Sequence, residues 1–302
     1  MVRVLAALAL PVLVPTIITL LIWSLPGDPA SLICPAESCG STEVLSARWN
    51  LDQGPQGFLS AWLGDAVQGD LGRSWRLQQG VQVNELIGDA LPNTLILLAL
   101  ALIPLTIGTL RAALGPLPRG FGPVIQVLGL VPALVLALVA AAVVELRWGS
   151  ASFGDAASWA RLIAGALVLG LADGALSGAV GGTRALFEAE ARQRYVGIAL
   201  LRGEGVLGNT LPNVAPALAG QVRGRVLHLL SGAVIVEAIL RIDGVGDLLW
   251  GGTLLQDFGV VLASATIFAL ISSALLLLQA MAEVLIALVV RRSPDLGEGA
   301  GA

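Results

Sequence analysis

Long apolar stretches constrain this chain more than any other feature of its sequence. A helix needs about 20 mostly apolar residues to cross a bilayer. Of the 302 residues, 56% are hydrophobic and 13% are charged, whereas a typical soluble domain has about 25% charged residues. We therefore expect an all-α, polytopic membrane protein with about six transmembrane helices. The six candidate stretches are 4–25, 91–110, 123–144, 162–183, 214–240 and 258–290.

The first stretch is expected to remain in the protein as a transmembrane helix. The apolar core of a cleavable signal peptide has about 7–15 residues and is followed by a small-residue cleavage site. The stretch 4–25 is longer and has no clear site of that kind. Pro104 and Pro132 are expected inside transmembrane helices, which tolerate proline when neighbouring groups satisfy the freed backbone.

The arginines predict the orientation of the chain. With the N-terminus inside, nine arginines fall in cytosolic segments and six in outer segments, and cytosolic loops carry the excess of basic residues. Both termini are therefore expected on the cytosolic side. The predicted organisation is a first helix (1–25), an outer segment (26–88), a transmembrane core (89–290) and a cytosolic tail (291–302).

The outer segment contains a predicted amphipathic helix and three candidate structural residues. Asp28 lies between Gly27 and Pro29, a context that favours a turn; contact with a substrate-delivery protein is the alternative. Cys34 and Cys39 are the only cysteines. Outside the cytosol they predict one small disulfide loop, with two free thiols as the alternative and too few ligands for a metal site. Apolar residues at helical spacing follow: Phe58, Leu59, Trp62, Leu63 and Val67.

A charged segment at 184–212 interrupts the apolar chain. It carries four arginines and is the largest surface that the predicted orientation exposes to the cytosol. A helix is expected over 185–201, with Gly203 as its stop. We interpret the segment as a docking surface for a motor protein; an ordinary charged loop is the alternative.

The chain contains no lysine. Its 17 Lys and Arg residues are all arginine. A P-loop requires a lysine that reaches the phosphates, so any ATPase must be a separate polypeptide. The single histidine, His228, is not part of an H-E-x-x-H motif, and no G-x-S-x-G motif is present, which argues against an intramembrane enzyme. No cofactor is expected in this chain, and no nucleic-acid partner.

The fifth apolar stretch holds Arg223, Arg225 and His228. An arginine at the centre of a membrane costs about 2.5–3.5 kcal/mol, so these side chains should avoid lipid. Arg225 and His228 share a helix face and could line a translocation path, together with Glu237. Alternatively they pair with Asp173 or Glu237, and Arg223 reaches the cytosolic surface. A stand-alone secondary transporter with an Asp173, Arg225 and His228 relay is the alternative function.

Four stretches resemble the membrane subunits of dipeptide/oligopeptide-type ABC importers. They are the LPGDPA motif at 25–30, the outer segment at 49–75, the second apolar stretch at 91–108, and the segment at 231–249. They occur in the family's order and are spread over most of the chain.

The resemblance implies a type I ABC importer permease fold in the bacterial inner membrane. It implies a second, similar permease, two ATPase subunits that bind ATP and Mg²⁺, and an external substrate-binding protein as partners, with a peptide or similar small solute as substrate. Gly197 replaces the family's acidic residue, and the segment after Gly203 is about four residues short, roughly one helical turn. We therefore expect a short or irregular coupling element. The residues implied to contact the ATPase are Arg184, Arg192, Tyr195, Ala199, Arg202 and Gly203.

Overall fold

The computed structural model describes residues 2–27, 29–33, 42–115, 121–149 and 155–292, and this part of the chain is helical throughout apart from its loops. One isolated antiparallel pairing joins Arg73 and Gln82. Asp28, Cys34 and Cys39 lie outside the described residues, so the turn and the disulfide stay predictions. The elements are α1 (Val2–Ser24), α2 (Pro29–Ile33), α3 (Thr42–Arg48), η1 (Leu51–Gln53), α4 (Gly54–Val67), α5 (Val83–Leu114), α6 (Phe121–Gly129), α7 (Ala133–Trp148), α8 (Asp155–Leu171), η2 (Ala172–Gly174), α9 (Ala175–Ala191), α10 (Arg194–Leu201), α11 (Val206–Leu240), α12 (Val245–Leu255) and α13 (Phe258–Arg292).

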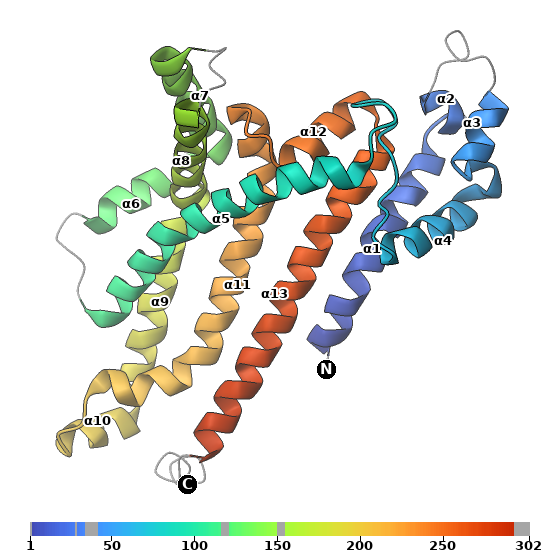
Figure 1. The fold of residues 1–302 in the computed structure, drawn as a ribbon. Coiled ribbons are helices and arrows are strands. Elements are labelled where there is room, and N and C mark those ends of the chain that lie inside the picture. Colours follow the sequence, from blue (N-terminus) through green and yellow to red (C-terminus); the bar gives the residue numbers. More distant parts are fainter. Residues whose placement is uncertain (1, 28, 34–41, 116–120, 150–154, 293–302) are drawn as a thin grey trace.

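Four helical segments in the described part are long and apolar enough to cross a membrane, and a bent pair would make a fifth. They are Val4–Ser24, Val83–Leu114, Ala156–Ala191 and Phe258–Leu285, with Gly122–Gly129 and Ala133–Trp148 as the pair. The 35-residue α11 runs beside α9 and α13 in the bundle (Figure 1). The fifth predicted stretch, 214–240, lies in α11 and carries Arg223, Arg225 and His228, and α11 is not among these candidate spans. The architecture is that of an all-α polytopic membrane protein, as expected.

The third predicted span is not one straight helix. α6 and α7 meet at an angle of 94°, and Pro132 lies at the N-terminal cap of α7 instead of inside a helix. The break has a cause in the sequence, because a proline ends a preceding helix more readily than it continues one. The expectation that Pro132 lies within a helix was therefore wrong, whereas Pro104 does lie inside α5.

The fourth predicted span is kinked at Asp173, which adopts a left-handed conformation with φ 51°. The Asp173 amide donates a hydrogen bond to the Val131 carbonyl at 3.2 Å, and its carboxylate accepts one from the Ala133 amide at 3.1 Å. A Cβ on Gly129 would lie 3.1 Å from the Gly174 Cα atom. The kink between α8 and α9 is thus docked on the bend between α6 and α7.

Two apolar clusters hold the molecule together. The larger one lies between α5, α7, α8, α9 and α11. The smaller one joins α4, the loop that follows it, and the first turns of α5 and α13, while α1 packs along α13. In the amphipathic helix α4, Phe58 and Trp62 are buried and Val67 is exposed, so the apolar face of α4 lies against the bundle.

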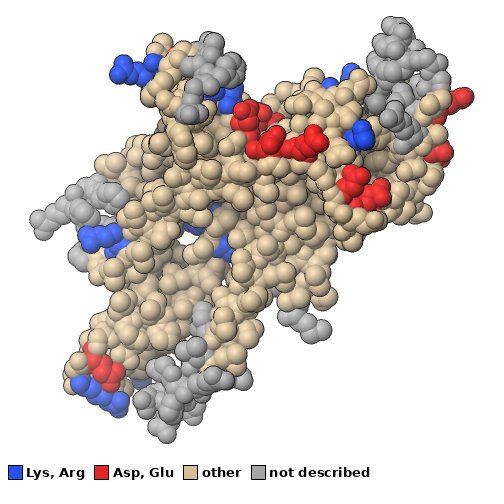
Figure 2. All heavy atoms as spheres, in the orientation of Figure 1, with Lys and Arg blue, Asp and Glu red and all other residues tan. Residues whose placement is uncertain are grey.

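Charged side chains gather mainly at the two ends of the molecule. Figure 2 shows acidic side chains gathered over the region of α12 and the start of α5, and both signs of charge at the lower end that carries α10. Blue atoms are also visible in the hollow at the middle of the molecule.

Candidate functional site

α10 is separated from α9 by a break in the helix and from α11 by a turn at a glycine. α9 ends at Ala191, and Gln193 then has extended backbone angles before α10 begins. After α10, Gly203 has φ +82°, a left-handed conformation that glycine adopts without steric cost. Because two reversals follow each other within a few residues, α10 projects as a separate eight-residue helix at the end of the bundle (Figure 1).

Tyr195 ties this projection to both flanking helices. Its hydroxyl donates a hydrogen bond to the Glu190 carboxylate on α9, and it accepts one from the Asn213 amide on α11 at 2.6 Å. Burial and the neighbouring Glu190 raise the pKa of the Tyr195 hydroxyl above its usual value. The hydroxyl therefore stays protonated, and able to donate, at neutral pH.

The predicted coupling residues divide into inward and outward groups. Ala199 is buried, like Val196, so it holds α10 against the rest of the chain. Arg184 forms a 2.8 Å salt bridge with Glu188, one turn further along α9. The outward face of α10 is apolar as well as basic, because Ile198 and Leu201 are 52% and 89% exposed.

One detail of the predicted segment was wrong. The helix expected over 185–201 is interrupted at Arg192 and Gln193, since α10 starts anew at Arg194. The coupling element was expected to be short or irregular, and α10 has only eight residues before the turn at Gly203, after which α11 begins at Val206. The role of Gly203 as a stop is confirmed by its left-handed turn.

A cavity of about 270 Å³ lies between α5, α9 and α11, and its lining includes Leu207 in the first turn of α11. Most of its lining is leucine and alanine, and Arg225 and Gln221 of α11 are its strongest polar groups. A Cβ on Gly178 would lie 2.4 Å from an Arg225 guanidinium nitrogen, so Gly178 makes room for that side chain. Thr183 also lines the cavity, and its hydroxyl is buried without a hydrogen-bond partner within the described part of the chain.

Comparison with known proteins finds relatives over most of the chain. The chain is 26% identical over 269 residues to the glutathione transport system permease protein GsiC of Escherichia coli (strain K12), and the match spans 85% of this chain and 87% of that protein. The proteins of the same name from Shigella boydii serotype 4 and Shigella dysenteriae serotype 1 match to the same extent. No family model matches the sequence. The chain is thus similar to permease subunits of peptide-type ABC transport systems.

The two acids that were alternative partners for Arg225 are engaged elsewhere. Asp173 binds the backbone at the α6–α7 bend, as described above. Glu237 is fully buried, and its carboxylate accepts a 2.7 Å hydrogen bond from the Gly246 amide at the start of α12. The pairing of Arg225 with Asp173 or Glu237 was therefore wrong. Burial also argues against Glu237 as a residue that lines a path.

The other cations of the fifth apolar stretch lie apart from this cavity. The Arg223 Nε atom is buried with no hydrogen-bond partner among the described residues. His228 is half-buried, and it is absent from the lining of the Arg225 cavity. Among the three, only Arg225 faces this cavity.

The far end of the molecule contains a site that the sequence did not predict. The buried carboxylate of Asp257, immediately before α13, accepts hydrogen bonds from the amides of Trp75, Arg76 and Leu77 and from the Ser74 hydroxyl. It also accepts one from the Val260 amide, which is an N-terminal cap of α13. An aspartate directly before an apolar run is a sequence signal for such a cap, but nothing in the sequence indicated the loop as its partner.

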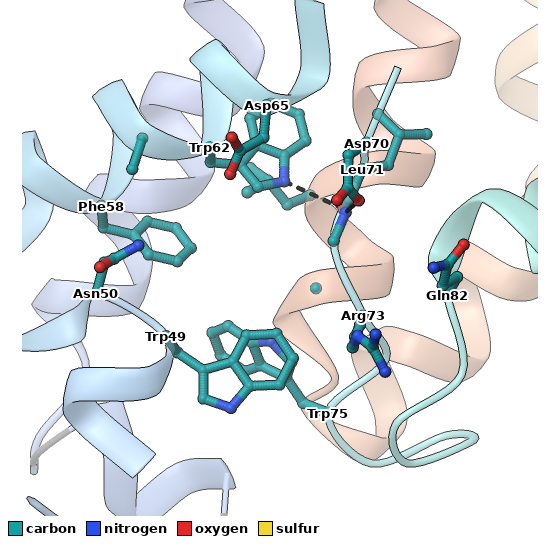
Figure 3. A pocket seen from close by; sticks show the side chains of 14 residues that line it. Trp49, Asn50, Phe58, Trp62, Asp65, Asp70, Leu71, Arg73, Trp75 and Gln82 are labelled. Carbon is teal, nitrogen blue, oxygen red and sulfur yellow. Dashed lines mark hydrogen bonds between the residues drawn. The ribbon is translucent and has the colours of Figure 1, made fainter. Parts of the chain in front are cut away.

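Beside this loop, a second cavity opens between α4, the loop and α13. Figure 3 shows the side chains that surround it, with Phe58 and Trp62 from α4 on one side and Arg73 from the loop on the other. Trp49 and Trp75 close its lower end in this view.

Proposed function

We propose that this permease forms one half of the translocation pathway of an ATP-driven importer and takes its driving force through α10. Separate ATPase subunits would dock on the exposed face of that helix. The observation that carries the proposal is the position of α10, an exposed helix tied by Tyr195 to α9 and α11, both of which line the Arg225 cavity.

The charge distribution supports the proposed orientation, with α10 and both termini in the cytosol. Cytosolic segments of membrane proteins are rich in arginine, and the exposed arginines of α9 and α10 lie at this end of the molecule. The opposite end carries exposed acids, including Glu85, Asp89 and Asp243, and would face the substrate-binding protein. A second permease would complete the pathway, and ATP with Mg²⁺ would be bound by the ATPase subunits.

Arg225 is the residue that we place on the pathway. It is the strongest charge on the cavity and has no hydrogen bond or ion pair with any described residue. An uncompensated guanidinium in a largely apolar cavity needs an anionic partner, and the carboxylate of a small peptide or similar solute would supply one. His228 is placed one turn further along the same helix and would line the path beyond this cavity.

The alternative of a stand-alone secondary transporter has less support. A proton relay requires its members to be linked, and no hydrogen bond joins Asp173, Arg225 and His228 within the described residues. The structural use of Asp173 at the kink accounts for its charge without a relay.

Affinity purification of the tagged permease, followed by reconstitution with the chains that accompany it, tests the proposal. We expect ATPase chains to accompany the permease, and uptake into liposomes to stop when ATP hydrolysis is blocked by vanadate. A cysteine placed at the exposed Ile198 should cross-link to the ATPase, whereas one at the exposed Val143 of α7 should not. Transport by this chain alone, driven by an ion gradient, would contradict the proposal.

A further inference from the structure

The aromatic cavity at the end of the permease away from α10 is large enough for a small ligand. Its volume is about 240 Å³, and its walls come from α4, the loop 68–82 and the start of α13. An engineered cavity of about 150 Å³ in another protein accommodates benzene. The cavity shares no lining residue with the Arg225 cavity, so it is a separate site.

Four aromatic rings form much of the cavity wall: Trp49, Phe58, Trp62 and Trp75. The Trp62 indole donates a hydrogen bond to the Leu71 carbonyl at 3.3 Å. Trp75 packs edge to face against Trp49 and Phe58, with ring centroids 5.7 and 6.3 Å apart. The loop that carries Trp75 is itself held by Asp257. These contacts fix the rings before any ligand enters.

The charged groups on the cavity carry a net negative charge. Asp65 belongs to α4 and Asp70 to the loop, and Figure 3 shows their carboxylates on either side of Trp62. The Asp70 carboxylate accepts a hydrogen bond from the Gly72 amide, and Asp65 is an exposed side chain. The Arg73 guanidinium donates to the Gly80 carbonyl at 3.2 Å, which occupies it within the loop.

We propose that this cavity binds a small, water-soluble organic cation with a substituted ammonium group. The faces of tryptophan and phenylalanine rings attract cations, and aromatic cages that bind quaternary ammonium ions use this attraction. The Asp65 and Asp70 carboxylates add a Coulombic attraction. An anion would be repelled by both acids, and a neutral apolar ligand would take water from them without compensation.

Choline and its neutral isostere 3,3-dimethylbutan-1-ol provide a direct test, because they share a shape and differ in charge. The full-length permease is placed in nanodiscs of phosphatidylethanolamine and phosphatidylglycerol, and binding is followed by saturation-transfer NMR of the ligand methyl protons, with empty discs as the blank. We expect choline to bind about tenfold more tightly than the isostere, the effect of a desolvated cation–π contact. Equal binding of the two, or no binding of choline, would overturn the proposal.

Two variants and a control locate the binding site. Asp65→Asn should weaken choline binding about fivefold by removing one nearby charge, and Trp49→Leu should weaken it about tenfold by removing one ring face. Asp52→Asn removes an exposed acid in η1 that does not line the cavity and should leave binding unchanged. If Asp52→Asn and Asp65→Asn weaken binding equally, choline binds to surface charge in general and the site is refuted.

A third arm separates a soluble ligand from a lipid headgroup. In discs that also contain phosphatidylcholine, the affinity for free choline should be unchanged if the cavity takes ligands from water. A fall in affinity that follows the phosphatidylcholine content would show that the headgroup is the occupant, and would overturn the assignment to a soluble cation. Because the readout is binding at a site remote from α10, its failure leaves the ATPase proposal untouched.

Discussion

The Asp257 carboxylate accepts a 2.5 Å hydrogen bond from the hydroxyl of Ser74, which lies 183 residues earlier in the chain. The same carboxylate receives the amides of the three residues that follow Ser74. One buried side chain thereby attaches the loop between α4 and α5 to the first turn of α13. The loop has hardly any regular structure of its own, so its shape depends on this attachment.

Replacement of Asp257 by alanine should therefore destabilise the permease strongly. Removing the acceptor leaves buried donors unsatisfied, at a cost of about 1–3 kcal/mol for each such group. We expect a total loss of about 3–5 kcal/mol, seen as a lower thermal unfolding midpoint of the detergent-solubilised protein. Asp52→Ala, at an exposed position, is the control. An unchanged midpoint in Asp257→Ala would show that the loop is held by other contacts.

Gly246 should tolerate no side chain. A Cβ at this position would lie 2.6 Å from the Val234 Cα atom and 2.8 Å from a Glu237 carboxylate oxygen, and the backbone atom cannot swing away. We expect Gly246→Ala to cost about 1–3 kcal/mol through overpacking, measured by the same thermal midpoint. Gly64→Ala is the matched control, since no atom lies within 4 Å of its added methyl group. Equal midpoints for the two variants would contradict the expected close approach.

The stability of the α12 region should fall as the pH rises through about 6. Burial, together with the negative charge of Asp243, raises the pKa of Asp247 from 3.8 to about 6. The 11-residue α12 is too short to span a membrane. Because the folded protein holds this proton more tightly than the unfolded chain does, the stabilisation is complete below about pH 4 and is lost above pH 6.

Asp247→Asn isolates this effect. At pH 7.5 the variant should be more stable by about 1 kcal/mol, after allowance for solvent screening at a half-exposed side chain. Its unfolding midpoint should also vary less than that of the wild type between pH 4.5 and 7.5. A parallel pH dependence in the two proteins would assign the effect to other groups.

Arg225→Ala should reduce uptake and leave the complex assembled. Loss of the cavity's guanidinium removes the proposed contact with an anionic solute, for which we expect about tenfold slower uptake, equivalent to about 1.4 kcal/mol. Uptake of labelled solute into proteoliposomes and the amount of co-purified ATPase are measured together. Arg147→Ala, at an exposed position of α7, is the control. Loss of the ATPase chains along with uptake would instead assign Arg225 a role in assembly.

Tyr195→Phe should weaken the coupling between ATP hydrolysis and transport. The variant keeps the ring and loses the hydroxyl that joins Glu190 to Asn213, at about 1 kcal/mol for each hydrogen bond. We expect more ATP hydrolysed per solute transported, with the ATPase still bound. Trp159→Phe, an exposed aromatic change on α8, controls for general effects. An unchanged ratio would show that α10 is held without this hydroxyl.

Local signals predicted much of the helical framework but not its interruptions. The long apolar stretches, the amphipathic α4 and the stop at Gly203 follow from periodicity and glycine conformation. The bend before α7 and the kink at Asp173 stabilise one another through hydrogen bonds. A contact between two segments cannot be predicted from the sequence of either segment alone.

The same limit applies to the functional residues. An arginine in an apolar stretch marked Arg225 as unusual, but only the fold shows that it faces a cavity while His228 does not line it. Asp257 and Ser74 are unremarkable in sequence, because a contact across 183 positions depends on the packing of the whole bundle. The aromatic cavity likewise combines residues from three elements.

The α9–α10–α11 hairpin has a mechanical consequence. Both α9 and α11 line the cavity that contains Arg225, and α10 connects them. A force applied to α10 therefore acts directly on α9 and α11, two of the three helices that line the cavity, without passing through α5. A small tilt of this eight-residue helix would thus change the shape of the cavity without unfolding or rebuilding any of the long helices.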